Sequence, residues 1–120
     1  MLERIKSTSP NVLAMRAVGK ITDEDYKTVL IPAVESQIQA QRKVRFVYVI
    51  GPEFESFSMQ AMLDDALFGL HHWRDLERVA VVTDRDWIAH AMQIFMPLLP
   101  AKSKVFHTDQ LKDALAWAAA

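Results

Sequence analysis

The chain contains no cysteine, which excludes disulfide bonds, thiolate zinc sites and a cysteine nucleophile. Glycine is scarce as well, with three in 120 residues, and none lies in a Gly-rich cluster of the kind that cradles phosphates. The G-x-S-x-G elbow of the serine hydrolases is also missing. These absences remove the familiar catalytic frameworks. We therefore predict that the protein is not an enzyme and has no cofactor.

Long hydrophobic runs and a dominant charge are missing too. No apolar run reaches the roughly 18–20 residues that a membrane-spanning helix needs. The first ten residues, MLERIKSTSP, lack the apolar region of a secretion signal. The net charge is −1, and acids and bases are mixed along the chain, so the sequence contains no basic tract for nucleic acid or a membrane surface. We expect a cytoplasmic protein with no nucleic-acid partner and no transmembrane segment.

What the chain does have is enough apolar sequence for a core. With 51% hydrophobic residues over 120 positions, residues 1–120 are predicted to form one domain. Leu2–Lys6 and Val12–Val18 are predicted to be antiparallel strands joined by a short polar turn. The continuous apolar run Val44–Ile50 predicts a strand buried on both faces. A loop over Glu53–Phe57 is expected to follow it.

Helix signals alternate with these strands. Thr22 is the expected N-cap of a first helix, because acidic residues at positions 23–25 suit the positive end of the helix dipole. Pro32 is expected to kink that helix or split it in two. A second helix is predicted from about Ser58 to His72.

The second half of the chain continues the alternation. Arg78–Val82 is predicted to be a buried strand, with Thr83 or Asp84 capping the helix that follows. Lys104–His107 is a short last strand, and Thr108 is expected to cap a final helix. The order ββαβαβαβα predicts an α/β single domain: a mixed, mainly parallel five-stranded sheet covered by about four helices, with right-handed crossovers.

The four histidines do not form a metal motif. His71 and His72 are adjacent and would point about 100° apart on a helix, so they cannot chelate one ion together. His90 and His107 belong to different elements. We predict no metal site.

The segment Trp87–Leu99 is apolar nearly all round, since only His90 and Gln93 are polar within it. A helix that covers a sheet needs a single apolar stripe. At 1.5 Å per residue the segment is roughly 20 Å long, too short to cross a bilayer core of about 30 Å. Three interpretations stay open: dense core packing, contact with a second copy or another protein, or a pocket for an apolar ligand. Membrane contact is disfavoured because the basic face of an interfacial helix is absent.

Two sets of candidate residues follow from these interpretations. For an interface, Ile94 and Met96 are expected on the outer face of the helix, and two leucines follow on the turn near Pro97. The candidate interface residues are Ile94, Met96, Leu98 and Leu99. For a small apolar ligand such as a fatty acyl chain or isoprenoid, the candidate lining residues are Met59, Met62, Trp87, Ala91, Met92 and Phe95.

Three stretches also resemble a known family. ITDEDY (Ile21–Tyr26) with the following Pro32, the run from Phe68 to Trp87, and FHTDQLKDALAW (Phe106–Trp117) are similar to the small bacterial anti-sigma-factor-antagonist-like proteins. These are also called sporulation stage II AA-like and form a divergent branch of the STAS-type fold. The resemblance covers nearly the whole chain. It implies a regulatory module that binds a protein partner or a second copy, with the loop Gly51–Ser58 and the helix Asp84–Met96 as its surface.

The resemblance also implies a phosphorylation switch where the central strand meets the next helix. Ser56 and Ser58 are the hydroxyls available there, and a phosphate at a helix N-terminus would meet free N–H groups. The sequence departs from the family pattern, because the Asp-Ser-Ser/Thr handover is missing and the loop is longer. Glu53 and Glu55 would also repel added charge. The alternative is that Ser58 is an ordinary N-cap.

Overall fold

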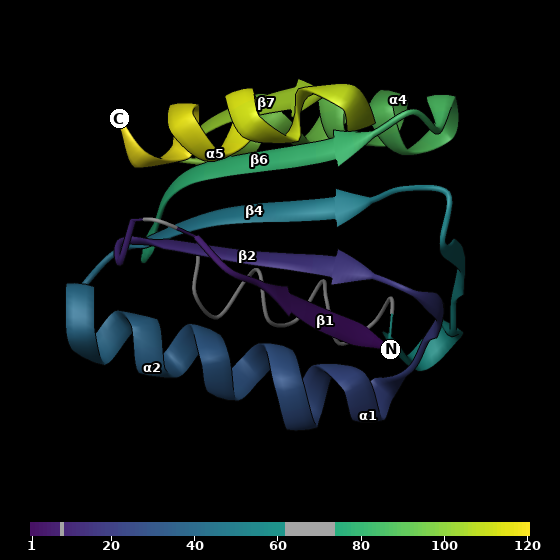
Figure 1. The fold of residues 1–120 in the computed structure, drawn as a ribbon, viewed down its shortest axis with the longest axis horizontal. Coiled ribbons are helices and arrows are strands. Elements are labelled where there is room, and N and C mark those ends of the chain that lie inside the picture. Colours follow the sequence, from purple (N-terminus) through teal and green to yellow (C-terminus); the bar gives the residue numbers. More distant parts are fainter. Residues whose placement is uncertain (8, 62–73) are drawn as a thin grey trace.

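The computed structural model describes residues 1–7, 9–61 and 74–120, apart from the side chain of Phe95. Its main sheet has five strands in the spatial order β1-β2-β4-β6-β7 (Figure 1). The first pair is antiparallel and every other neighbouring pair is parallel, which confirms the predicted mixed, mainly parallel sheet. The strands are β1 (Leu2–Ile5), β2 (Val12–Ala17), β4 (Val44–Ile50), β6 (Leu76–Thr83) and β7 (Lys102–Phe106).

Helices cover both faces of this sheet. The strand order advances in one direction only, so right-handed crossovers place the connecting helices on one face. That face carries a continuous helical run and then a later helix that ends in a 3₁₀ turn. The elements are α1 (Asp23–Asp25), η1 (Tyr26–Leu30) and α2 (Ile31–Gln41), then α4 (Asp86–Phe95) and η2 (Met96–Leu98). The opposite face is covered by α5 (Leu111–Ala119), which follows the short η3 (Thr108–Gln110) (Figure 1).

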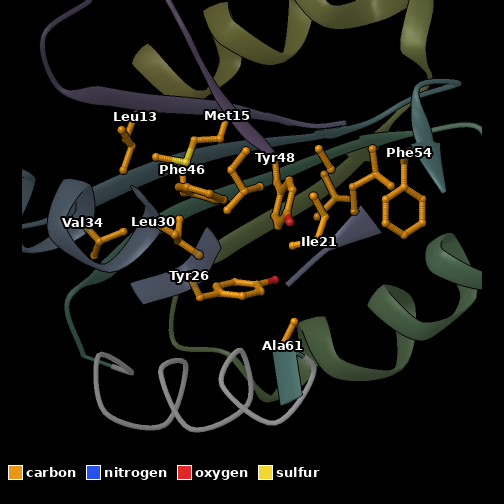
Figure 2. Close-up of a cluster of buried hydrophobic side chains, with 14 of the residues drawn as sticks. Leu13, Met15, Ile21, Tyr26, Leu30, Val34, Phe46, Tyr48, Phe54 and Ala61 are labelled. Carbon is orange, nitrogen blue, oxygen red and sulfur yellow. The ribbon is translucent and has the colours of Figure 1, made fainter. Parts of the chain in front are cut away.

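The core has one cluster on each side of the sheet. Along β4, Phe46 and Tyr48 pack toward α2, while Val47 and Val49 pack toward α5. Figure 2 shows the larger cluster, where Tyr26 and Leu30 of η1 meet the aromatic side chains of β4. Because side chains alternate between the faces of a strand, a strand buried on both sides must be apolar throughout. The predicted strand Val44–Ile50 is confirmed.

Pro32 does not split the first helix in two, and a kink there stays a prediction. It is the second residue of α2, and the preceding segment η1 is a π-helix in which the Ile31 N–H donates to the Tyr26 carbonyl. Proline has no N–H and its ring presses on the carbonyl four residues back, so a wider turn at this point leaves room for it. The chain therefore stays helical from Asp23 to Gln41.

The loop expected over Glu53–Phe57 was wrong. Phe54–Phe57 forms the strand β5, which pairs in parallel with β3 (Gly19–Ile21) in a separate small sheet. Phe54 is buried, and its ring lies 4.7 Å from that of Phe57, centroid to centroid. Each strand is too short to show a period by itself, and their pairing depends on contacts between distant parts of the chain. The small sheet continues from the ends of β2 and β4, where the helix after Ser58 begins.

Candidate functional site

Asp84 joins two elements at the carboxyl-terminal edge of the parallel strands. Its carboxylate accepts a 3.0 Å hydrogen bond from the Thr108 N–H and another from the Thr108 hydroxyl, and the His107 Nδ1 lies 3.3 Å away. The side-chain and backbone hydrogen bonds of Thr108, followed by that of His107, hold the pKa of Asp84 below its usual range. Asp84 therefore ties the end of β6 to the start of η3 rather than serving as a free base.

These contacts correct two expected helix caps. Asp84 does not cap α4, whose N-cap is Arg85, and the Thr83 hydroxyl instead accepts a hydrogen bond from the Arg85 N–H at 3.1 Å. Thr108 does not cap the final helix: it begins η3, whose N-cap is His107, and the N-cap of α5 is Gln110. The His107 N–H donates to the Gln110 side chain at 2.9 Å. The physical reason is that the Asp84 carboxylate accepts hydrogen bonds from the start of η3, which is distant in the sequence. Local spacing does not reveal such a partner.

Arg85 is turned away from solvent. Its guanidinium donates to the Phe54 carbonyl and lies over the Phe54 ring, 5.1 Å from the centroid. This contact attaches the start of α4 to β5. It also leaves the acidic side chains of Asp84 and Asp86 as the exposed charges at this end of the helix.

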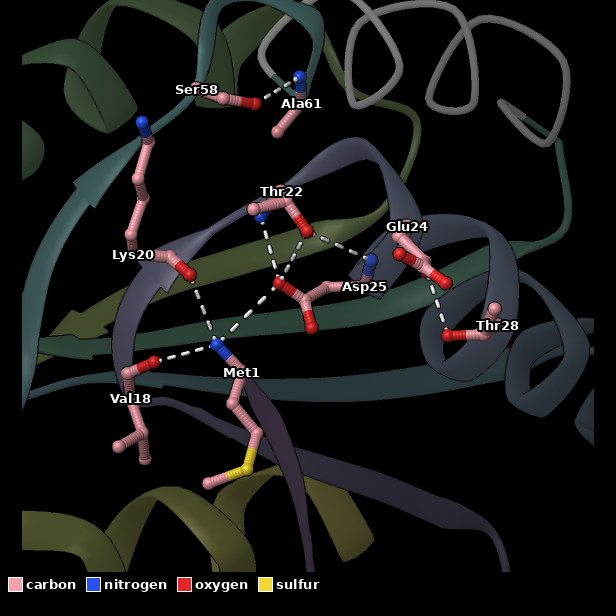
Figure 3. A network of polar contacts seen from close by, with 9 residues as sticks. All are labelled: Met1, Val18, Lys20, Thr22, Glu24, Asp25, Thr28, Ser58 and Ala61. Atoms are coloured by element: carbon pink, nitrogen blue, oxygen red, sulfur yellow. Dashed lines mark hydrogen bonds and ion pairs between the residues drawn. The ribbon is translucent and has the colours of Figure 1, made fainter.

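Thr22 is the N-cap of the first helix, as predicted. Its N–H and hydroxyl donate to the Asp25 carboxylate at 2.8 and 2.9 Å, and the Met1 amino group lies 3.5 Å from the same carboxylate (Figure 3). Partial burial disfavours the charged form of Asp25. The hydrogen bonds from Thr22 and the Met1 ammonium outweigh that effect and hold its pKa below the usual value. The network fixes the entry into α1 beside the start of the next helix.

The structure places the two candidate phosphorylation residues differently. Ser58 is half-buried, and its hydroxyl accepts a 3.0 Å hydrogen bond from the Ala61 N–H (Figure 3). Its own N–H donates to the Ile21 carbonyl. This is the geometry of an N-cap. Ser56 is exposed on β5, in register with Lys20 of β3. Phosphorylation of either residue stays a prediction.

A second surface lies on the outer side of α4 and η2. Trp87, Ile94 and Leu98 are 57%, 70% and 63% exposed, and Ala91 between them is half-buried. The spacing of four, three and four residues puts these side chains on one line along a helix. We call Trp87, Ala91, Ile94 and Leu98 the α4 stripe.

The inner side of the same helix packs on the sheet. Ile88 is only 4% exposed, and Met92 and Met96 pack against the core cluster on the α2 side. Met96 therefore faces inward, contrary to the expected outer position. Leu99 is half-buried just beyond η2. The all-round apolar character of Trp87–Leu99 thus resolves into a buried inner face and an exposed outer one.

The candidate ligand-lining residues do not share one environment. Met59 is 82% exposed and Trp87 is also exposed, whereas Met92 contacts the core. Met62 and the side chain of Phe95 lie outside the described part of the structure, as do His71 and His72. The expected helix from Ser58 begins at Met59, and its remainder beyond Ala61 lies outside the described residues as well.

A groove that the sequence analysis missed lies beside the turn between β1 and β2. It has a volume of about 420 Å³, with Ile5, Val12 and Ala14 among its apolar lining and Arg4, Lys6 and Gln37 among its polar lining. Arg4 on β1 and Lys6 just after that strand were a visible signal. Their significance depends on the turn lying next to α2, where Gln37 donates to the Pro10 carbonyl at 2.9 Å.

Metal and membrane features were also sought over residues 1–7, 9–61 and 74–120. Within these ranges no three His, Asp or Glu side chains come together in a way that could hold a metal ion. Among the helices in the same ranges, none has both the length and the apolar character needed to cross a membrane.

Comparisons with known proteins agree with this architecture. Residues 12–119 match the SpoIIAA-like family. A crystal structure from Shewanella loihica PV-4, described as an uncharacterized protein with a SpoIIAA-like fold, superimposes with a TM-score of 0.79 at 28% sequence identity. The match covers 98% of this chain and 92% of that one. A search of curated proteins finds no match. The chain belongs to the SpoIIAA-like family.

Proposed function

We propose that this protein is a non-catalytic regulatory module that works by protein contact in the cytoplasm, with a second copy as the first occupant of the α4 stripe. The observation that carries the proposal is the exposure of three large apolar side chains in line along α4 and η2. Large apolar side chains exposed together favour association, because contact removes them from water. Family membership fits a module of this kind.

The composition of the stripe supports pairing between two copies. Ala91 lies at its middle, and a small side chain there allows two helices to approach closely. A two-fold pair would place Trp87 of one copy toward Leu98 of the other, so that one patch serves as both halves of the interface. Ile94 and Leu98 each keep about two thirds of their side chain exposed, so burying either would contribute roughly 1–2 kcal/mol.

The alternative is a carrier or sensor of a small apolar ligand held near the same helix. The inward position of Met92 and Met96 is what favours it, because methionines adapt to irregular ligands. The exposure of Met59 and Trp87 argues against an enclosed pocket at those two positions. One mass measurement distinguishes the two functions. A carrier would be purified with the added mass of a ligand, whereas the module would have the added mass of a second subunit.

The test is native mass spectrometry of the wild-type protein and of Ile94→Glu, purified without detergent. We expect the wild type to contain dimers and the variant to be monomeric, because the new carboxylate would have to be buried in an apolar contact. Circular dichroism of both proteins checks that the fold is unchanged.

The matched control is Gln93→Glu, which adds the same charge one position along on the same exposed helix. Residue 93 points about 100° away from residue 94, off the stripe. The control should dimerise like the wild type. Equal loss of dimers in both variants would mean that charge on the helix, rather than the stripe, governs association, and the proposal would fail.

A further inference from the structure

Charges that are mixed along the sequence are separated in the folded protein. The amino-terminal ends of the parallel strands carry exposed cations, whereas the carboxyl-terminal ends and the start of α1 carry mainly acids. The acidic end includes Glu53, Glu55, Asp84 and Asp86, and Arg85 there is turned onto Phe54. We call the exposed cations at the opposite end the basic edge; they are Lys6, Arg42, Lys43, Arg74 and Lys102.

Backbone register places these cations along the amino-terminal edge of the sheet. The turn after Lys6 leads to Val12, which pairs with Arg45 just after Lys43. Lys43 donates to the Arg74 carbonyl, so the approaches to β4 and β6 touch. The next strand begins at Lys102, paired with Arg78. The row therefore crosses the whole sheet.

Two other arginines at this end already have partners and do not belong to the row. Arg45 pairs with Glu77 at 2.5 Å and donates to the Ala118 carbonyl of α5 at 3.0 Å. Arg78 donates to the Trp117 carbonyl and lies 5.3 Å from the centre of the Trp117 ring. These contacts stabilise the carboxyl end of α5, where cations offset the helix dipole.

Arg4, Lys6 and Arg42 differ from that pair. In the part of the chain that the structure describes, none of these three cations has an ion-pair partner. Arg42 also has a φ of 68°, in the left-handed region, at the position after α2 where glycine is the usual residue. An arginine there costs backbone energy of about 1 kcal/mol relative to glycine, which points to a use for its charge.

The groove beside the β1–β2 turn opens at one end of this row. Arg4 lies on β1 and Lys6 directly follows that strand, and both line the groove. Ile5, Val12 and Ala14 line the same groove from the face of the sheet that α5 covers.

We propose that the basic edge and this groove bind an extended acidic segment of a partner protein, in which acidic and apolar residues alternate. From β1 to β7 the sheet spans four strand spacings, roughly 19 Å, which about six extended residues would cover. The apolar lining of the groove favours a peptide over nucleic acid, because a nucleic-acid backbone is bound through its charged phosphates and offers no apolar side chains. This surface is separate from the α4 stripe, and the proposal does not depend on dimerisation.

The test is fluorescence anisotropy with a labelled eight-residue peptide that alternates glutamate and leucine. A peptide of lysine and leucine with the same label is the control ligand. We expect the wild type to bind only the acidic peptide, with affinity falling about tenfold between low and high salt, because exposed charges are screened. The double variant Lys6→Glu/Arg42→Glu should weaken binding at low salt by about tenfold or more.

The matched control is Lys20→Glu/Lys112→Glu, which changes the net charge equally at exposed positions away from the basic edge. It should bind within about twofold of the wild type. Thermal melts establish that both double variants fold. If Lys6→Glu/Arg42→Glu does not fold, Lys6→Glu/Lys102→Glu is used in its place.

Four results would overturn the proposal. The first is absent or salt-independent binding of the acidic peptide. The second is an equal loss of peptide affinity in the two double variants. Tighter binding of a short DNA duplex to the basic edge is the third. The fourth is salt-sensitive self-association that Lys6→Glu/Arg42→Glu abolishes, which would make the acidic end of a second copy the occupant.

Discussion

Ile88 and Ile94 give a direct measure of how α4 is oriented. Both are isoleucines on the same helix, but Ile88 is 4% exposed in the core and Ile94 is 70% exposed on the stripe. Replacing each by alanine removes the same atoms from the same kind of backbone. Differences in helix propensity therefore cancel between the two variants, and only burial distinguishes them.

The expected effects differ by several kcal/mol. Ile88→Ala removes buried methyl and methylene groups beneath the helix and should lower the free energy of unfolding by about 2–4 kcal/mol. Ile94→Ala should change it by less than about 0.5 kcal/mol, because most of that side chain is already in water. For a domain of this size, the first change corresponds to a melting temperature lower by about 6–15 °C.

The assay is urea unfolding followed by circular dichroism, run at two protein concentrations. A concentration-independent gap between the two variants supports the orientation of α4 described above. A cost for Ile94→Ala that matches that of Ile88→Ala at low concentration would refute it, because the stripe would then be core. A cost for Ile94→Ala that appears only at high concentration would instead report dimer contact.

Two further predictions concern the helix N-termini near the small sheet. The folded-state pKa of Asp25 is lowered, so its stabilisation is complete above the unfolded pKa near 4 and is lost as pH falls through the folded value. Asp25→Asn should therefore be less stable than the wild type at pH 7, with a gap that closes below about pH 4 in urea titrations; a gap independent of pH would contradict this. Ser58→Ala should cost about 1 kcal/mol by removing the acceptor for the Ala61 N–H, while Ser58→Asp should stay close to the wild type. Equal stability of Ser58→Ala and the wild type would show that the cap has no energetic role.

The central strand shows how much of the fold the sequence predicts. Six of the seven residues from Val44 to Ile50 are apolar or aromatic, as a strand buried on both faces requires. The exception is Arg45, which donates to the Ala118 carbonyl at the end of the sheet. The helix start at Thr22 is equally local, since the cap and its acceptor Asp25 lie three residues apart. Features governed by near neighbours were therefore predictable.

Several of the missed features depend on partners distant in sequence. β3 and β5 are three and four residues long and exist because they pair with each other. Asp84 looks like a local cap but bonds to Thr108, 24 residues away. The basic edge is invisible along the chain because parallel strands bring together residues that the sequence separates.

The candidate site was predicted only in part, for the same physical reason. Composition revealed that the segment after Asp86 has more apolar side chains than one face can bury. It did not reveal which of them point outward, because a helix apolar all round has no polar face to fix its rotation. Ile94 and Leu98 are exposed, whereas Met96 packs against the core; an interface at these residues stays a prediction.

The measurement that tests the account most directly is native mass spectrometry of the wild type, Ile94→Glu and Gln93→Glu under identical conditions. The account predicts dimers without ligand for the wild type and Gln93→Glu, and monomers for Ile94→Glu. The same subunit count in all three proteins would contradict a role for the α4 stripe in association. A mass increase of lipid size on the wild type would replace the module with an apolar carrier.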